Sequence, residues 1–238
     1  MKLRRSIDSH SGQLQKLTSQ NAYILNNGFS PVTLNKKGFL VLLGITALVI
    51  IISALALSLP YGSPLEVVVR LFALYGYLTL SVATMTTPFL KEIPKVFGKT
   101  FIKVHHIFAI VGTASATVHP VAYAIQTLDP TVFLPSLRSW YAFWALAGRP
   151  ALIIIYIALA AALVRRKMQT YWRSIHAMMY VVLFLGIVHA NLIGTDFQNP
   201  VINTLFNLLF AASIAAFALK RIQRHQLKKR LRSKTDRR

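Results

Sequence analysis

The sequence contains no cysteine and few acidic residues. None of its 238 residues is Cys, and six are Asp or Glu. A chain without thiols forms no disulfide bonds, holds no iron–sulfur cluster through cysteine and cannot attach a c-type haem covalently. Any metal that it binds must therefore be held by histidine, methionine, carboxylate or carbonyl groups.

Positive charge and apolar side chains are, in contrast, abundant. The 27 Lys and Arg residues give a formal net charge of +21, and 55% of the residues are hydrophobic, with a mean hydropathy of +0.52. A basic domain that binds nucleic acid carries its cations on polar surfaces, whereas here they flank long apolar runs. We therefore predict an integral membrane protein that binds no nucleic acid.

Six apolar stretches are long enough to be membrane-spanning helices. A bilayer core about 30 Å thick requires about 20 residues of helix at about 1.5 Å per residue. The fourth stretch is interrupted by Gly148-Arg149-Pro150, so we expect it to begin with a short interfacial segment. The expected fold is an all-α bundle of six helices at about 39–59, 67–89, 101–126, 141–164, 172–194 and 201–219. This domain, 39–219, follows a polar and basic segment, 1–38, and precedes a basic cytoplasmic tail, 220–238.

The distribution of the cations predicts the orientation of the chain. Lys and Arg concentrate in the N-terminal segment, in alternate loops and in the tail, and only Arg70, Arg138 and Arg149 fall on the opposite side. Because short cytoplasmic loops retain positive residues, both termini are expected in the cytoplasm of a multi-pass protein of the plasma or inner membrane. The tail is expected to continue the last helix into the anionic lipid headgroups, with the docking of an acidic partner as the alternative.

Five of the seven histidines fall in two of the predicted helices. His105, His106 and His119 lie in the third helix, and His176 and His189 in the fifth. These two helices run in the same direction, so His105 shares a depth with His176, and His119 with His189. Two neutral imidazoles saturate a haem iron and leave a centre suited to electron transfer rather than oxygen binding. The pattern predicts two b-type haems, each held by one of these pairs.

The spacing within each helix refines this prediction. His105 and His119 are 14 residues apart, which is nearly four turns, so they share a helix face about 21 Å apart along the axis. This phase favours His105 over His106, which stays as the alternative ligand. The 13 residues between His176 and His189 place them about 140° apart on a straight helix, so tilting or crossing of the helices is needed.

Cations near the expected haems are candidates to bind the haem propionates, which are anions. Arg70 and Arg149 lie near outer helix ends, and Lys103 and Arg173 precede His105 and His176 on the inner side. Snorkelling and ordinary membrane anchoring explain the same positions. Gly112, seven residues from both His105 and His119, allows either a macrocycle or another helix to approach closely.

At these residues the sequence resembles the ferric reductase-like transmembrane domain family over about 70–220. The family includes ferric-chelate reductases, the membrane part of NADPH oxidases and MsrQ, the haem-binding subunit of a periplasmic methionine sulfoxide reductase. The third helix, with H-x13-H ending in His119-Pro120, is similar to the paired-ligand helix of the reductases and oxidases. The pattern W-R-x-x-H-x-x-x-Y-x8-H from Trp172 to His189, and Gly148-Arg149-Pro150, look like MsrQ.

The resemblance implies an oxidoreductase component that passes electrons from the cytoplasm to the outer face. The sequence contains no dinucleotide-binding fingerprint, so the expected donor is a separate flavoprotein or a quinol, with FMN or quinone as a further bound group. An extracytoplasmic acceptor protein is expected in an MsrQ-type system, which is the alternative to a ferric reductase. Two interpretations of another class are a non-redox permease that uses the histidines as a proton relay and a membrane scaffold.

Overall fold

The computed structural model describes residues 35–98, 100–168 and 170–235. In these ranges every regular element is a helix, and no strand occurs. Within these ranges five helices are long and apolar enough to cross a membrane, and the chain is a membrane protein. They are Lys36–Leu57, Pro64–Phe89, Ile102–Thr127, Trp172–Ile193 and Pro200–Leu227. Of the predicted N-terminal segment, 1–38, residues 1–34 lie outside the described residues.

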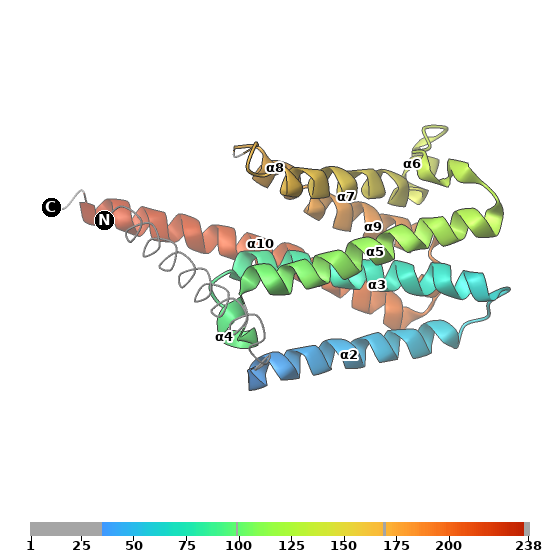
Figure 1. Ribbon diagram of the computed structural model, residues 1–238, viewed down its shortest axis with the longest axis horizontal. Helices are drawn as coiled ribbons and strands as arrows, with labels where there is room; N and C mark the ends of the chain where they lie inside the picture. The colour runs from blue at the N-terminus through green and yellow to red at the C-terminus, as the bar shows by residue number, and fades with distance from the viewer. Residues whose placement is uncertain (1–34, 99, 169, 236–238) are drawn as a thin grey trace, which may run out of the picture. The chain divides into compact units, whose positions relative to one another are not determined.

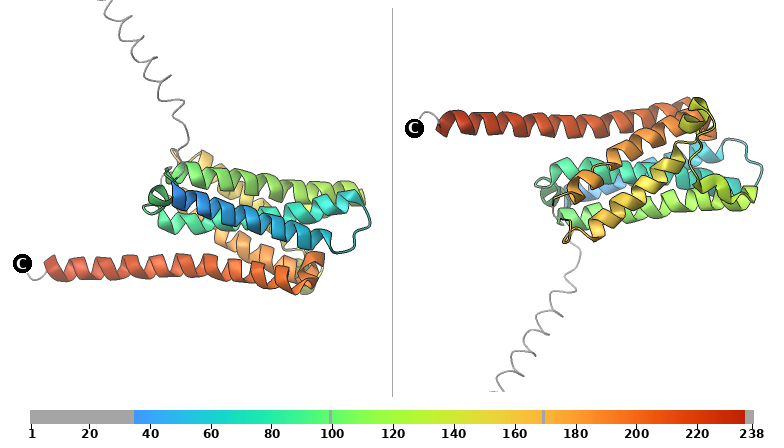
Figure 2. Two further views of the ribbon diagram at one scale, coloured as in Figure 1. Left: turned by 90° about the horizontal axis from the view of Figure 1, so that it is seen from below. Right: turned by 90° about the horizontal axis from the view of Figure 1, so that it is seen from above.

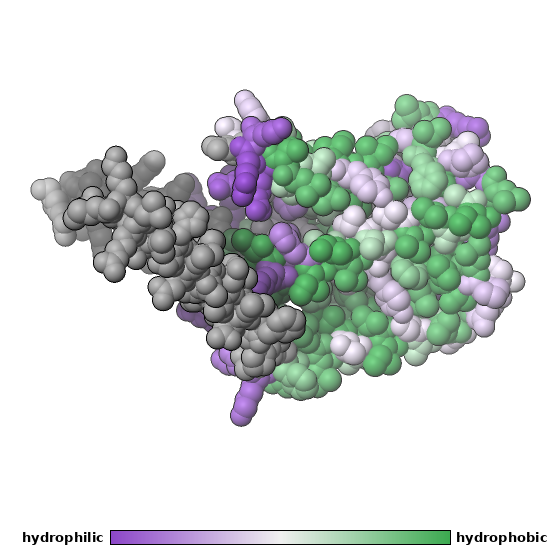
Figure 3. Space-filling model, in the orientation of Figure 1, coloured by the Kyte–Doolittle hydropathy of each residue, from purple (hydrophilic) through white to green (hydrophobic). Residues whose placement is uncertain are grey.

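The helices form a bundle whose centre is the pair α3 and α5 (Figure 1). The apolar surface of this bundle faces outward over its length, and hydrophilic side chains gather toward its ends, as a membrane protein requires (Figure 3). The helices are α2 (Lys36–Leu57), α3 (Pro64–Thr86), α4 (Ile93–Phe97), α5 (Phe101–Thr127), α6 (Trp140–Ala145), α7 (Gly148–Leu163), α8 (Trp172–His176), α9 (Met179–Ile193) and α10 (Pro200–Thr235). Short 3-10 turns η1 (Thr87–Phe89), η2 (Pro130–Phe133) and η3 (Thr195–Gln198) join some of them.

Local sequence signals set the ends of several helices. The Ser63 hydroxyl accepts the Glu66 N–H at the start of α3, where Pro64 occupies the first helical position. Ser139 caps α6 in the same way. Gly98 ends α4 with a φ of 65°, a left-handed conformation that glycine adopts without steric cost. The turns between the helices therefore follow from capping and glycine chemistry.

The predicted fourth and fifth spans are each divided by a tight turn. In the fourth, the Arg149 N–H donates to Leu146 O, so α6 ends at Ala145 and α7 begins at Gly148. The remaining apolar helix, α7, has 16 residues, which is shorter than the other five spans. In the fifth span, α8 ends at His176 and α9 begins at Met179. The six predicted stretches are thus five long apolar helices and one short one.

Close packing of α3 against α5 depends on two glycines. A Cβ on Gly76 would lie 3.0 Å from the backbone nitrogen of Ala116, and a Cβ on Gly112 would lie 2.7 Å from Leu80 Cγ. Both glycines therefore serve contact between α3 and α5. For Gly112, the sequence allowed the close approach of either a macrocycle or another helix, and in the structure another helix, α3, occupies this position.

The last helix, α10, continues well past the apolar span. It has 36 residues, and the expected boundary at 219–220 falls inside it. Figure 2 shows its C-terminal part extending beyond the other helices of the bundle. Lys220 lies where α10 leaves the bundle; its Nζ is 2.6 Å from Glu92 Oε1 and 4.8 Å from the centre of the Phe89 ring. We call this end of the bundle, where the α3–α5 and α7–α8 turns also lie, the basic end (Figure 1).

Candidate functional site

Four histidines form two facing pairs inside the bundle. The ring centroids of His105 and His176 are 6.0 Å apart, and those of His119 and His189 are 6.5 Å apart. Each pair joins α5 to the α8–α9 segment, so the structure brings together the residues that the sequence paired by depth. We call the pair nearer the basic end, His105 and His176, the inner pair, and His119 and His189 the outer pair. His106, the alternative ligand, has an exposed side chain beside His105.

All four paired histidines are held in the same way. In each, Nδ1 lies within hydrogen-bonding distance of a backbone carbonyl. A carbonyl only accepts, so Nδ1 carries the proton and Nε2 keeps its lone pair. A hydrogen bond from the other ring nitrogen to a carbonyl is also what orients metal-binding histidines. The pairs of atoms are His105 Nδ1 and Ala83 O (3.1 Å), His119 Nδ1 and Val69 O (2.8 Å), His176 Nδ1 and Ala158 O (3.4 Å), and His189 Nδ1 and Ala145 O (2.6 Å).

The spacing of the acceptors follows the spacing of the histidines. Ala83 and Val69 on α3 are 14 residues apart, as are His105 and His119 on α5. The carbonyls that accept from His176 and His189 are 13 residues apart, like the histidines themselves. Antiparallel neighbours thus supply an acceptor at the depth of each ligand.

The break between α6 and α7 provides the acceptor for His189. In a regular helix the Arg149 N–H would bond to Ala145 O, but here it donates to Leu146 O. Ala145 O instead accepts from His189 Nδ1. Gly148 lies against the same ring, since a Cβ there would be 3.1 Å from His189 Cδ2. The predicted interruption at Gly148-Arg149-Pro150 therefore shapes the site directly.

The break between α8 and α9 brings His176 and His189 closer in phase. The Met178 N–H donates to Ile175 O, and the Tyr180 N–H donates to Ala177 O. Residues in such i to i+3 turns rotate by about 120° each instead of about 100°. The extra rotation reduces the 140° separation expected on a straight helix. The break therefore supplies part of the change in phase, and tilting or crossing of the helices supplies the rest.

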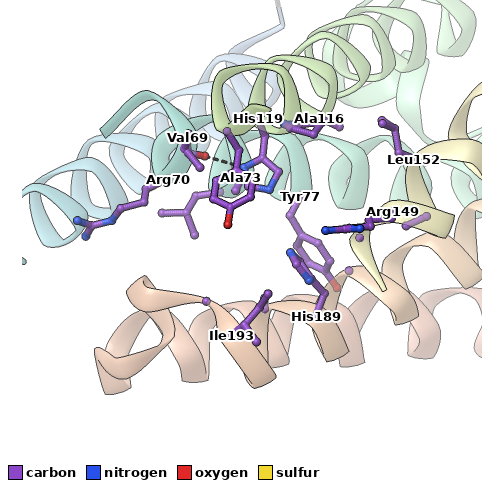
Figure 4. Close-up of a pocket in the computed structure, with 18 of the residues that line it drawn as sticks. Val69, Arg70, Ala73, Tyr77, Ala116, His119, Arg149, Leu152, His189 and Ile193 are labelled. Atoms are coloured by element: carbon purple, nitrogen blue, oxygen red, sulfur yellow. Dashed lines mark hydrogen bonds between the residues drawn. The ribbon is translucent and has the colours of Figure 1, made fainter. Parts of the chain in front are cut away.

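A cavity of about 590 Å³ lies between His119 and His189. This volume is in the range of small-molecule and cofactor sites. Figure 4 shows the two histidines reaching into it from α5 and α9, with Arg149 at one side and Tyr77 between the helices. Apolar side chains form most of the remaining wall. The outer pair thus has space for a flat macrocycle beside it.

Two buried hydroxyl groups lie near the depth of the inner pair. Ser81 is two residues from Ala83, the acceptor of His105, and its side chain interacts with the Tyr77 hydroxyl. Tyr180 is one turn beyond His176, and its Oη has no hydrogen-bond partner among the described residues.

Arg70 and Arg149 line the outer cavity but also bind the protein. The Arg70 guanidinium donates to Asp196 Oδ1 and to the carbonyls of Pro60 and Ala56. Through these contacts, Arg70 on α3 holds the end of α2 and the η3 turn in place. Arg149 Nη1 donates to Thr131 O and Leu134 O. Arg149 thereby ties the start of α7 to the η2 segment while facing the cavity (Figure 4).

Lys103 and Arg173, the inner candidates, have exposed side chains at the basic end. The Arg173 guanidinium carbon lies 5.7 Å from the centre of the Trp172 ring. The positions of Lys103 and Arg173 are compatible with binding of haem propionates and also with the ordinary role of positive residues in a cytoplasmic loop.

Tyr77 is a site residue that the sequence did not single out, whereas Trp172 begins the W-R-x-x-H pattern of the predicted fifth helix. Tyr77 on α3 lies near the midpoint between Val69 and Ala83, and its hydroxyl donates to Leu183 O on α9. It therefore lies between the two histidine pairs in depth. The Trp172 ring is 6.2 Å from His176. The sequence does show Tyr77 as a polar aromatic residue inside an apolar span. Its position between the histidine pairs, however, follows only from the packing of α3 against α9.

The family is shown by comparison with known sequences. The profile of the ferric reductase like transmembrane component family matches residues 69–187, half of the chain. The chain belongs to this family. The match to the ferric reductase-like component includes His105, His119 and His176 and ends two residues before His189. No curated protein and no solved structure matches the chain. Membership in this family suggests transmembrane electron transfer.

The donor set of the ferric reductase-like domain suits haem. Among the described residues, no three His, Asp or Glu side chains come together to hold a metal ion. A haem needs only two axial ligands from the protein, because its macrocycle supplies the others. With metal–nitrogen bonds of about 2 Å and about 1 Å from each nitrogen to its ring centre, two axial imidazoles have centroids about 6 Å apart. Both observed pairs have this separation.

Proposed function

We propose that this protein carries electrons across the membrane through two b-type haems. His105 and His176 hold the inner haem, and His119 and His189 hold the outer haem. The observation that supports this most strongly is the common geometry of the four rings, each with Nδ1 at a carbonyl and each facing its partner. Such rings present Nε2 to an iron between them.

The residues around each pair control the properties of the site. A haem, when bound, supplies a reversible one-electron couple. The backbone carbonyls fix the rotation of each imidazole and make it a stronger ligand. The apolar walls exclude water and so influence the reduction potential. Two axial histidines leave no open coordination position, which suits electron transfer rather than oxygen chemistry.

The remaining cations and the partners are assigned by position. Arg149 and Arg70 line different sides of the outer cavity and bind the propionates of the outer haem, whereas Lys103 and Arg173 serve the inner one. A cytosolic flavoprotein or a quinol donates electrons at the basic end, with FMN or quinone as a further cofactor. The acceptor lies on the outer face, as in a ferric reductase or an MsrQ-type subunit.

Single histidine substitutions test the two sites. We expect two haems per chain and two spectral components in the dithionite-reduced minus oxidised spectrum. His119→Ala and His189→Ala should remove the same component, because both take an axial ligand from the outer haem. His105→Ala and His176→Ala should both remove the other component, that of the inner haem. His106→Ala is the matched control and should keep both. Loss of the inner component in His106→Ala but not in His105→Ala would contradict the inner assignment, and haem-free protein would contradict the function.

A further inference from the structure

The turn between α7 and α8 combines exposed cations with an aromatic side chain that reaches the inner histidines. We propose that this turn is the docking surface for a soluble, acidic electron-transfer protein, and that electrons enter the membrane domain through Trp172. We call it the Trp172 surface. The inference rests on the proposed function and adds the class of donor and its binding position. Its members are Arg165, Arg166, Lys167, Tyr171, Trp172 and Arg173.

The aromatic contacts define a path from this surface into the bundle. Tyr171 is 68% exposed, and the adjacent Trp172 is half-buried. The Trp172 ring is 6.2 Å from the His176 ring, which is 6.0 Å from the His105 ring. Consecutive π systems at this separation give short steps between the aqueous surface and the inner pair. Trp172 is therefore placed to pass an electron to a haem held by His176.

The charge around Trp172 indicates the chemistry of the partner. Arg165, Arg166, Lys167 and Arg173 all have exposed side chains, and none makes a salt bridge with a described residue. Figure 3 shows hydrophilic side chains gathered at the α7–α8 end of the bundle. Opposite charge on a partner steers encounter and fixes its orientation. An acidic face around the redox group of the donor complements this surface.

The other described turn of the basic end has a different composition. At the α3–α5 turn a carboxylate, Glu92, lies among the lysines and is paired with Lys220. The exposed ring beside a paired histidine there is the imidazole of His106, which neighbours His105. Cytoplasmic retention of positive loops accounts for cations at either turn. The Trp172 surface differs in that its cations surround an indole in contact with His176 and include no carboxylate.

The proposed step is a simple outer-sphere transfer. With a haem held by His105 and His176, the reduced donor would lose one electron and that haem would gain it. No bond forms or breaks, and no proton moves in the protein. The surface therefore has to provide only association and a short path.

Neutralisation of the surface tests the docking. The haem-loaded protein is placed in nanodiscs of phosphatidylcholine, and its reduction by an acidic flavodoxin in the hydroquinone state is followed by stopped-flow absorbance. We expect the triple substitution Arg165→Gln, Arg166→Gln and Lys167→Gln to lower the second-order rate about tenfold at low salt and to flatten its salt dependence. The control Lys37→Gln, Lys91→Gln and Lys95→Gln removes the same charge elsewhere on the basic end and should have a small effect.

Substitution of Trp172 tests the path separately. Trp172→Leu should slow reduction by flavodoxin at least tenfold at saturating donor, while Trp172→Phe retains most of the rate because the ring is kept. Both variants should keep the wild-type spectrum after dithionite reduction. That spectrum also separates the two proposals, because missing haem would contradict the proposed function, whereas normal haem with unaltered donor kinetics would overturn only the docking.

Three results would overturn the inference. The first is a wild-type rate that does not depend on salt. The second is equal slowing by the surface and control triples, which would indicate a general effect of net charge. The third is an effect of the surface triple only in nanodiscs that contain phosphatidylglycerol, which would assign these cations to anionic lipid headgroups.

Discussion

Individual side chains show how the outer pair is positioned. His189 has the shortest carbonyl contact of the four, 2.6 Å, and is also in contact with Gly148 at the start of α7. His176 has the longest, 3.4 Å. Ring orientation affects ligand strength, so we expect the outer site to be sensitive to small changes at the α6–α7 break.

Substitution of Gly148 tests this sensitivity. In Gly148→Ala the new Cβ would lie 3.1 Å from His189 Cδ2 and 3.2 Å from Nε2, so the ring must move by a few tenths of an ångström. We expect a shift in the spectrum and midpoint potential of the outer haem, with the inner haem unchanged. Gly44→Ala is the control, because nothing lies within 4 Å of a Cβ at that position. An unchanged outer haem in Gly148→Ala would contradict the predicted coupling.

Arg70 and Asp196 form a buried ion pair, with side chains 6% and 7% exposed. Asp196→Asn removes the negative charge and leaves the guanidinium buried beside a neutral amide. We expect a loss of about 3–5 kcal/mol in the free energy of unfolding, which is the usual cost of breaking a buried pair from one side. Thermal unfolding in detergent measures it. Glu92→Gln, which breaks the more exposed pair with Lys220, should lower the free energy of unfolding clearly less. Equal losses in the two variants would show that burial does not determine how much an ion pair stabilises this fold.

Among the elements, α3 and α5 have the closest contact. In Gly112→Ala the Cβ would lie 2.9 Å from the backbone nitrogen of Leu80, which cannot move without shifting the helix. We expect a loss of about 1–3 kcal/mol from overpacking. Because Ala83 O and Val69 O on α3 hold the histidines of α5, both haem spectra should broaden. Unfolding and haem retention unchanged from wild type would show that the helices separate freely.

The contact between α10 and the α3–α5 turn depends on pH. A hydrogen bond from Lys220 lowers the pKa of the Glu92 carboxyl below its ordinary value. Since the folded pKa is below the unfolded one, the stabilisation is complete above the unfolded carboxyl pKa of about 4.3 and is lost as the pH falls through the lower folded value. The difference in unfolding temperature between wild type and Glu92→Gln should therefore shrink below about pH 4. Lys220→Gln should show the same profile, whereas a difference that is constant with pH would contradict the pairing.

Sequence patterns predicted some elements and missed others for physical reasons. Apolar length identified the long helices, because burial in lipid requires it. The divisions at Ala145–Gly148 and His176–Met179 depend on which backbone N–H bonds to which carbonyl. Composition does not encode that choice, although Pro150 signalled the first division. The continuation of α10 past 219 agrees with the expectation for the tail, because helix propensity stays high there while hydropathy falls.

For the site, depth counting paired the histidines, and helical phase favoured His105, whose ring faces His176 in the structure. Counting did not find the carbonyl acceptors, because backbone groups have no signature in the sequence. Nor did it find the Asp196 partner of Arg70, which lies 126 residues away along the chain. Such contacts are set by the packing of whole helices.

At the scale of the whole molecule, the features form a continuous series between the two ends. Trp172 lies at the basic end, the inner pair follows, Tyr77 lies near the midpoint, and the outer pair faces the cavity beside Arg149. The two histidine pairs are about 20 Å apart in helix length. This arrangement favours passage of electrons along the bundle axis rather than chemistry at one site.

Electron transfer across a sealed membrane tests this account most directly. The haem-loaded protein is reconstituted into liposomes that contain ferricyanide, and dithionite is added outside. We predict that the trapped ferricyanide is reduced in liposomes with wild-type protein, and that His119→Ala and His105→Ala reduce the rate to that of protein-free liposomes. A wild-type rate equal to that of protein-free liposomes, with both haems present, would contradict the central claim.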